Sequence, residues 1–347
     1  MASALPIDHV WYRQLLALAA LVGAVLALLG LAYLGLTGAI TDLVFGDPRI
    51  DAWSGDWWWI PFTAVGGLVV AALRSWWGTT AHVPGGVAVI ESGEVDHRVA
   101  PSWVALAAVS AVAGASLGPS FALVMMGGGL TSWVASRIWR DDPDIRLDAT
   151  MAGIAGGFGG VFTSPGLGTL IVSELAPIRR ERYVEGLLPQ LIAATAAFAV
   201  FFGVAGSTLL NSFAVPTEEF SAWDLLTGVG LGIAASVIMI VFVLIVKLVQ
   251  AVAGKVSNGL VRGLVGGGLV GVIAVALPLT VGAGNDQLSA VIDESATINV
   301  WLLVAVLIGK MLAMALSLAT GFIGGPVMPT LFVGGAAGVA AHVIVPD

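Results

Sequence analysis

Residues 15–40 read LLALAALVGAVLALLGLAYLGLTGAI and contain no charged side chain. This run is longer than the roughly 20 apolar residues that a helix needs to cross a hydrocarbon core about 30 Å thick. It is also longer than the apolar core of about 7–15 residues in a secretory signal peptide, so we interpret it as a retained first membrane helix. Because the run is continuous rather than alternating, it predicts a helix and not a barrel strand.

Similar apolar segments recur along the rest of the chain. We expect them near residues 59–77, 102–114, 119–139, 149–163, 166–176, 187–210, 224–252, 258–281, 299–320 and 327–345. The 347 residues are 58% hydrophobic and 10% charged, with a mean hydropathy of +0.98. Soluble domains carry about 25% charged residues, so this composition predicts a chain whose solvent is lipid. We therefore expect an all-α polytopic membrane protein.

Composition also excludes several classes of function. The sequence has no cysteine, which rules out disulfides, thiolate metal sites and cysteine nucleophiles. Its net charge of -8 offers no basic patch for a nucleic acid partner. The four histidines are scattered, and no nucleophile-elbow, metal-binding or phosphate-loop pattern occurs. We expect a protein that is not an enzyme and that uses no cofactor or catalytic metal.

Charges around the first helix predict its orientation. His9 and Arg13 precede the helix, whereas residues 41–57 carry four aspartates against one arginine. Positive residues concentrate on the cytoplasmic side of membrane proteins, so we expect the N-terminus inside the cell. The expected location is the plasma membrane of a prokaryote.

Several of these apolar segments are too short to cross the membrane alone, and breaks that contain proline separate them. The breaks fall at Gly118-Pro119, Ser164-Pro165 and Gly325-Pro326. Irregular backbone at this depth is tolerated only where protein buries it or where it lines an aqueous cavity. The N-terminal ends of such half-helices attract anions. The breaks therefore favour a pathway for a small solute, with an inorganic anion as the first candidate.

Four stretches resemble, in chain order, motifs of the CLC family of chloride channels and proton-coupled chloride exchangers. They are residues 80–84, residues 115–119 with Gly127 and Gly128 downstream, residues 159–168 running on to Glu174, and the series 282–286, 309–310 and 324–329. The corresponding family patterns are G-S-G-I-P, G-x-E-G-P, A-A-F-N-A-P-L-x-G ending in glutamate, and G-x-G followed by lysine and G-G-x-F-x-P. The most similar of the four is the third.

The resemblance implies a CLC-like arrangement of two inverted halves with broken helices, assembled as a homodimer with a separate pore in each subunit. We place the first half, including the N-terminal helix, at residues 1–210 and the second half at residues 211–347. A full family member has further helices after the G-G-x-F-x-P segment, one of which carries a tyrosine that faces the anion. We therefore expect an incomplete second half, in a shortened member, a fragment, or a chain that borrows the missing wall.

The resemblance also implies a set of anion-pathway residues. They are Ala81, Ser116, Leu117, Gly118, Pro119, Gly325, Val327 and Met328. Leu117 stands at the family's gating-glutamate position and Ala81 at its first-loop serine, so neither a titratable gate nor that hydroxyl is present. We expect backbone N–H groups near Gly118 and the ends of broken helices to offset anion dehydration. The alternative for residues 116–118 is a purely structural turn. Val327 replaces the family phenylalanine, and Pro326 removes one N–H donor.

Two charged residues, Glu174 and Lys310, lie within apolar segments, where an unpaired charge costs at least about 2–3 kcal/mol. The family position for internal proton delivery falls on Leu175, which carries no proton. We expect Glu174 to pair with a backbone donor or with an arginine among residues 179–182, and proton transfer is the alternative. Lys310 is either a group of the solute pathway or a snorkelling residue at a helix end.

These replacements favour passive permeation of a chloride-like anion through a CLC-type pathway in the bilayer, without proton coupling. Two alternatives stay open. One is a non-conducting membrane protein that keeps the fold for assembly or regulation. The other is a coupled transporter of another solute that uses Lys310 or Glu174.

Overall fold

The computed structural model describes residues 6–46, 54–78, 86–177, 182–206, 221–295 and 298–344, and their regular structure is entirely helical. The elements are α1 (Val10–Phe45), α2 (Trp59–Trp76), α3 (Gly86–Ser92), α4 (Ala100–Val112), α5 (Ser120–Ile138), α6 (Pro143–Val161), α7 (Pro165–Leu175), α8 (Tyr183–Ala205), α9 (Trp223–Ala253), α10 (Gly259–Ala276), the 3-10 turn η3 (Pro278–Thr280), α11 (Asn285–Asp293), α12 (Val300–Thr320) and α13 (Val327–Ile344). Among these described helices, eight are long and apolar enough to cross a membrane. The predicted all-α, multi-span fold class is confirmed.

Each of the three predicted breaks falls between two helices: α4 and α5, α6 and α7, and α12 and α13. Local chemistry explains where the helices start and stop. The Ser164 hydroxyl accepts a hydrogen bond from the Leu167 N–H at 3.3 Å, and Pro165 occupies the first helical position of α7. α12 ends at Thr320 and is capped by Gly321, whose φ of 107° is a left-handed conformation that glycine adopts without strain.

Contacts divide the chain into two compact units, which we describe separately. Unit 1 comprises residues 1–36, 81–108 and 120–212, and unit 2 comprises residues 37–80, 109–119 and 213–347. Helices α1 and α4 contribute residues to both units. The division into inverted membrane halves near residue 210 stays a prediction.

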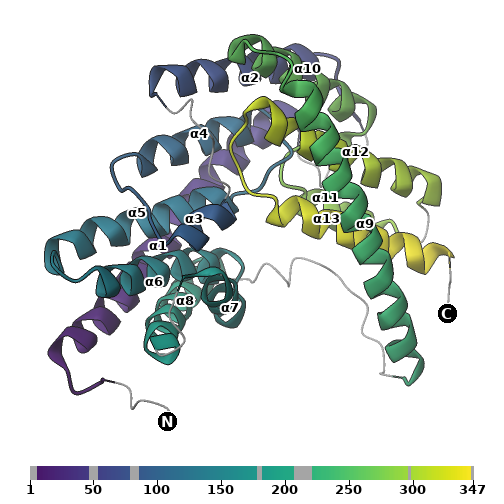
Figure 1. Ribbon diagram of the computed structural model, residues 1–347. Coiled ribbons are helices and arrows are strands. Elements are labelled where there is room, and N and C mark those ends of the chain that lie inside the picture. Colours follow the sequence, from purple (N-terminus) through teal and green to yellow (C-terminus); the bar gives the residue numbers. More distant parts are fainter. Residues whose placement is uncertain are drawn as a thin grey trace. The chain divides into compact units, whose positions relative to one another are not determined.

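Unit 1 is built around α6, which is buried on all sides from Asp148 to Val161. The helices α5, α7 and α8 all pack against it (Figure 1). Small residues allow this close approach: a Cβ at Gly127 of α5 would overlap the Gly153 carbonyl of α6, and a Cβ at Gly159 would lie 2.6 Å from the Ala194 Cα of α8. Backbone proximity of this kind is a principal source of helix association in lipid.

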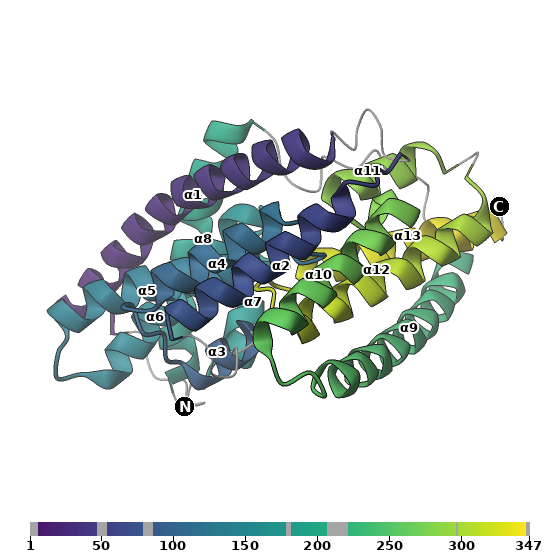
Figure 2. The ribbon, with the colours of Figure 1, turned by 90° about the horizontal axis from the view of Figure 1, so that it is seen from above.

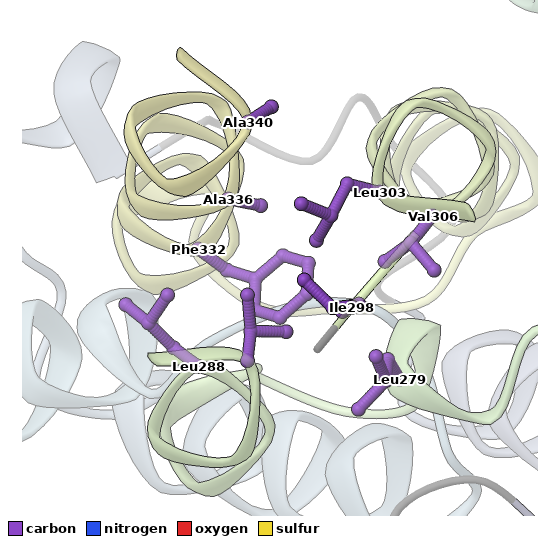
Figure 3. Packing of buried hydrophobic residues seen from close by; sticks show 9 residues of the cluster. Leu279, Leu288, Ile298, Leu303, Val306, Phe332, Ala336 and Ala340 are labelled. Carbon is purple, nitrogen blue, oxygen red and sulfur yellow. The ribbon is translucent and has the colours of Figure 1, made fainter. Parts of the chain in front are cut away.

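Unit 2 contains the pair α2 and α10, which run side by side (Figure 2). A hydrophobic cluster forms where α11, α12 and α13 meet, and there the Phe332 ring lies among Leu288, Ile298 and Leu303 (Figure 3). Within α9, Phe242 is the one buried residue. Most other residues of this long apolar helix are exposed and can contact lipid, although the helix also packs against α12.

Candidate functional site

The candidate site joins two loops that are far apart in the sequence. The loop between α4 and α5 and the loop between α12 and α13 meet in an antiparallel bridge within unit 2. The Gly118 N–H donates to the Gly325 carbonyl oxygen at 2.7 Å, and the Gly325 N–H donates to the Gly118 carbonyl oxygen at 2.9 Å. Two segments that the sequence placed in the anion pathway are therefore in direct contact.

Glycine is required on both sides of this bridge. A Cβ at Gly118 would lie 2.9 Å from the Met328 Cβ, and a Cβ at Gly324 would lie 2.6 Å from the Leu117 Cβ. Both distances are shorter than carbon–carbon van der Waals contact. The glycines therefore allow the two loops to approach closely, and they also bring the Leu117 and Met328 side chains to the contact.

Two serines hold the loops in place, and neither was identified from the sequence. The Ser116 N–H donates to the Ser317 Oγ at 3.2 Å, and the Ser317 hydroxyl donates to the Ala313 carbonyl at 2.8 Å. The Ser110 Oγ accepts from the Ile323 N–H at 2.9 Å. Both serines are fully buried. Polar residues inside a membrane helix are known to link elements by hydrogen bonds, which is the signal that could have identified them.

The backbone N–H groups near Gly118, which the sequence suggested as hydrogen-bond donors to an anion, already have acceptors within the protein. The N–H groups of Ser116, Leu117 and Gly118 donate to Ser317, Ala115 and Gly325, respectively, with the Leu117 bond at 2.7 Å. An anion would have to displace these acceptors. The expectation that these N–H groups are the available donors is therefore corrected: tertiary contacts that the sequence does not display already use them.

Other hydrogen-bond donors at the same bridge are not used in this way. The Ser116 Oγ is buried, and it has no hydrogen-bond partner within the described part of the chain. In α13 the first helical hydrogen bond runs from the Thr330 N–H to the Pro326 carbonyl at 2.9 Å. The N–H groups of Val327 and Met328 precede it, so they have no acceptor within their helix.

Lys310 lies in the middle of α12 and is completely buried. Its Nζ donates to the carbonyl oxygens of three consecutive residues: Thr280 at 3.1 Å, Val281 at 3.3 Å and Gly282 at 2.8 Å. It also lies 5.1 Å from the centroid of the Phe332 ring. Charge-assisted hydrogen bonds and the ring offset part of the cost of burying an ammonium. The side chain therefore does not snorkel, so that alternative is wrong, whereas a role of Lys310 in the solute pathway stays a prediction.

The contact with Lys310 explains why the motif at residues 282–286 contains glycine. Gly284 has a φ of 98°, and a Cβ there would lie 3.1 Å from the Lys310 Nζ. Glycine therefore allows the chain to turn tightly around the ammonium. Two separate parts of the CLC-like pattern, the G-x-G motif and the lysine, form one structural element.

Glu174 lies on α7 and its side chain is exposed. In the described ranges it has no hydrogen-bond or ion-pair partner, and Arg179 and Arg180 lie outside those ranges. Arg182 pairs with other carboxylates: with Asp144 at 3.0 Å, Asp148 at 2.8 Å and Glu185 at 3.1 Å. Within the described ranges neither a backbone donor nor Arg182 pairs with Glu174, because acids on α6 and α8 already pair with the Arg182 guanidinium. A pairing with Arg179 or Arg180 stays a prediction. The predicted pathway residue Ala81 also lies outside the described residues.

Comparison with known proteins decides the family. Residues 66–347 match the voltage gated chloride channel family. This chain belongs to the CLC family. A "Chloride/fluoride channel protein" of Pseudomonas syringae pv. tomato is 30% identical over 259 residues, which cover 71% of this chain and 54% of that protein.

Two solved structures share the CLC fold. A slow cyanobacterial Cl−/H+ antiporter is 20% identical, with a TM-score of 0.79 over 96% of this chain and 80% of that one. A CLC-type fluoride/proton antiporter is 19% identical, with a TM-score of 0.77 over 96% of this chain and 82% of that one. The chain spans about half the length of the curated relatives that it matches.

The bridged loops of this CLC member carry no charged side chain. Residues 109–119 and 321–330, all of which are described, contain no acidic, basic or histidine side chain. Leu117 is 3% exposed, and its side chain packs at the bridge. This CLC member thus has hydroxyl and amide donors at the bridge, with no group there that titrates near neutral pH.

Proposed function

We propose that this chain carries a small inorganic anion, with chloride the leading candidate and fluoride the second, passively across the membrane and without moving protons. The observation that supports this most directly is the Ser116 hydroxyl, which is buried and unpartnered in the described part of the chain. It belongs to the loop that the Gly118–Gly325 bridge joins to the start of α13.

The donors around the bridge suit a dehydrated anion. A hydroxyl from Ser116 and amides from Val327 and Met328 would replace part of a hydration shell. The N-terminal end of α13 adds the positive end of a helix dipole. Because these donors are neutral, they would bind an anion weakly enough to release it, which permeation requires.

The absence of proton coupling rests on side-chain chemistry. Coupled exchange needs groups that take up and release protons along the pathway. Leu117 and Leu175 stand where the family has carboxylates, and neither can hold a proton. Glu174 is exposed on α7. We infer a passive pathway, in a plasma-membrane protein with a cytoplasmic N-terminus that assembles as the family's homodimer.

The test compares Ser116→Ala with Ser102→Ala in proteoliposomes that contain the full chain. The Ser102 hydroxyl donates to the Val99 carbonyl on an exposed turn, so it serves as the matched control. A hydrogen bond to a charged group contributes about 1.5–3 kcal/mol, so Ser116→Ala should weaken the apparent anion affinity by about tenfold or more. Ser102→Ala should behave like the native chain.

Unchanged anion affinity in Ser116→Ala would remove Ser116 from the pathway. If the native chain itself gives no more flux than protein-free liposomes, permeation is wrong and a non-conducting role becomes the better account.

A further inference from the structure

A groove on unit 1 lies outside the bridged loops described above. It has a volume of about 610 Å³ and is formed by α1, α4 and α5. Its walls are almost entirely apolar, as Leu29, Val104, Met125 and Met126 illustrate. The volume falls within the range of about 300–1,000 Å³ that is usual for pockets that bind small organic molecules.

One end of the groove is polar and aromatic. His97, just before α4, and Trp133, in the second half of α5, both line it. They lie at the same end because α4 begins against α5: a Cβ at Gly129 would lie 2.6 Å from the Ala100 Cβ. The groove therefore runs from an apolar floor to an end of the kind found at a membrane surface, where indole rings concentrate.

A cation extends this polar end. The Arg137 guanidinium carbon lies 3.9 Å from the centroid of the Trp133 ring, and its Nη1 donates to the Trp133 carbonyl at 3.1 Å. No carboxylate forms an ion pair with Arg137 in the ranges that the structure describes. Its remaining N–H groups and its charge are thus available to an anionic partner.

The end of α5 lies beside the start of α1. Tyr12 and Leu15 pack against Ala135 and Trp139 in one buried cluster. The charge pattern around α1 predicts that this end faces the cytoplasm, where the membrane leaflet carries anionic lipids.

We propose that this groove binds one anionic phospholipid, with an acyl chain along the apolar walls and the phosphate at Arg137. Basic sites between membrane helices on the cytoplasmic side suit such headgroups. The apolar walls supply affinity for the chain, and the single arginine supplies the preference for negative charge. This inference is independent of whether the protein transports anions.

The probe is phosphatidylglycerol, compared with phosphatidylcholine of the same acyl chains, added to the delipidated full chain and detected by native mass spectrometry. The native protein should retain one phosphatidylglycerol in preference to phosphatidylcholine. Arg137→Gln should reduce that preference about fivefold, which corresponds to roughly 1 kcal/mol for one basic residue near a lipid headgroup. Arg13→Gln, an exposed arginine at the same end of the unit, should leave it unchanged.

A second pair of variants tests the groove itself. Ala105→Phe, on the groove wall, should displace both lipids, whereas Ala199→Phe, on an exposed face of α8, should not. Melting temperatures check that each variant is folded. Equal retention of the two lipids by the native protein, or a full response to Arg137→Gln without any effect of Ala105→Phe, would overturn the proposal. So would a change of oligomeric state in Ala105→Phe without loss of lipid, since a second copy would then occupy the groove.

Discussion

Gly118 and Gly325 exchange two backbone hydrogen bonds, at 2.7 and 2.9 Å, although one precedes α5 and the other precedes α13. This reciprocal pair fixes the register between two loops that carry most of the candidate pathway residues. Because these two bonds use N–H groups that an anion could otherwise contact, the donors left beside the bridge are the Ser116 hydroxyl and the first amides of α13.

The bridge predicts a strong effect for Gly118→Ala. The added methyl group would lie 2.9 Å from the Met328 Cβ, so the loops would have to separate. Overpacking of this kind costs about 1–3 kcal/mol, and we expect a lower melting temperature in detergent together with reduced anion flux. Gly338→Ala is the control, because a Cβ there meets nothing within 4 Å and helical alanine is favoured over glycine. A melting temperature for Gly118→Ala equal to that of the native chain would contradict the geometry of the bridge.

Lys310→Met should destabilise unit 2. The change removes the donor from three buried carbonyl oxygens, at a cost of about 2–3 kcal/mol in the free energy of unfolding. Lys247→Met, an exposed lysine on α9, should change the melting temperature little. Thermal unfolding of both variants in the same detergent makes the comparison, and equal melting temperatures would show that the carbonyl contacts are not stabilising.

Leu117→Glu should make anion flux depend on pH. The side chain lies at the bridge, where a carboxylate would compete with the anion at neutral pH. Protonation would remove that charge, so flux should rise as the pH is lowered. Leu117→Gln is the control, because glutamine has the same shape as glutamate but no titrating group. Its flux should vary with pH no more than that of the native chain. A pH-independent Leu117→Glu would place residue 117 away from the permeating anion.

Arg182→Gln should destabilise unit 1 more than Glu174→Gln does. Arg182 pairs with three carboxylates, of which Asp148 has a side chain only 4% exposed. Leaving that carboxylate unpaired should lower the free energy of unfolding by about 2 kcal/mol. This is less than the roughly 3–5 kcal/mol for breaking a fully buried ion pair, because Arg182 is itself partly exposed. Glu174→Gln should leave both melting temperature and flux unchanged, since Glu174 is exposed. Loss of flux in Glu174→Gln without loss of stability would show that its ionisation matters.

Hydropathy and proline breaks predicted much of the fold. The expected segment at residues 299–320 corresponds to α12, and that at 224–252 corresponds to α9. The prediction was less accurate where helices carry polar ends: α6 begins at Pro143, ahead of the expected 149, because Asp142 caps it and accepts from the Ile145 N–H.

The detail of the candidate site depended on contacts between distant segments. Motif order suggested that residues 116–119 and 325–328 belong together, but it could not show that Ser317 and Gly325 accept the N–H bonds of Ser116 and Gly118. Nor could it show that Lys310 is held by the carbonyl oxygens of residues 280–282. Sequence spacing reports local periodicity, whereas these partners are set by tertiary packing.

Anion efflux from proteoliposomes that contain the native chain, with external pH recorded at the same time, tests the central claim most directly. Chloride and fluoride are loaded separately, and ionophores set the membrane potential so that an uphill proton movement would be visible. We predict efflux above that of protein-free liposomes, with no proton movement against its gradient. The absence of efflux for both anions, or a fixed ratio of protons moved to anions released, would contradict the account.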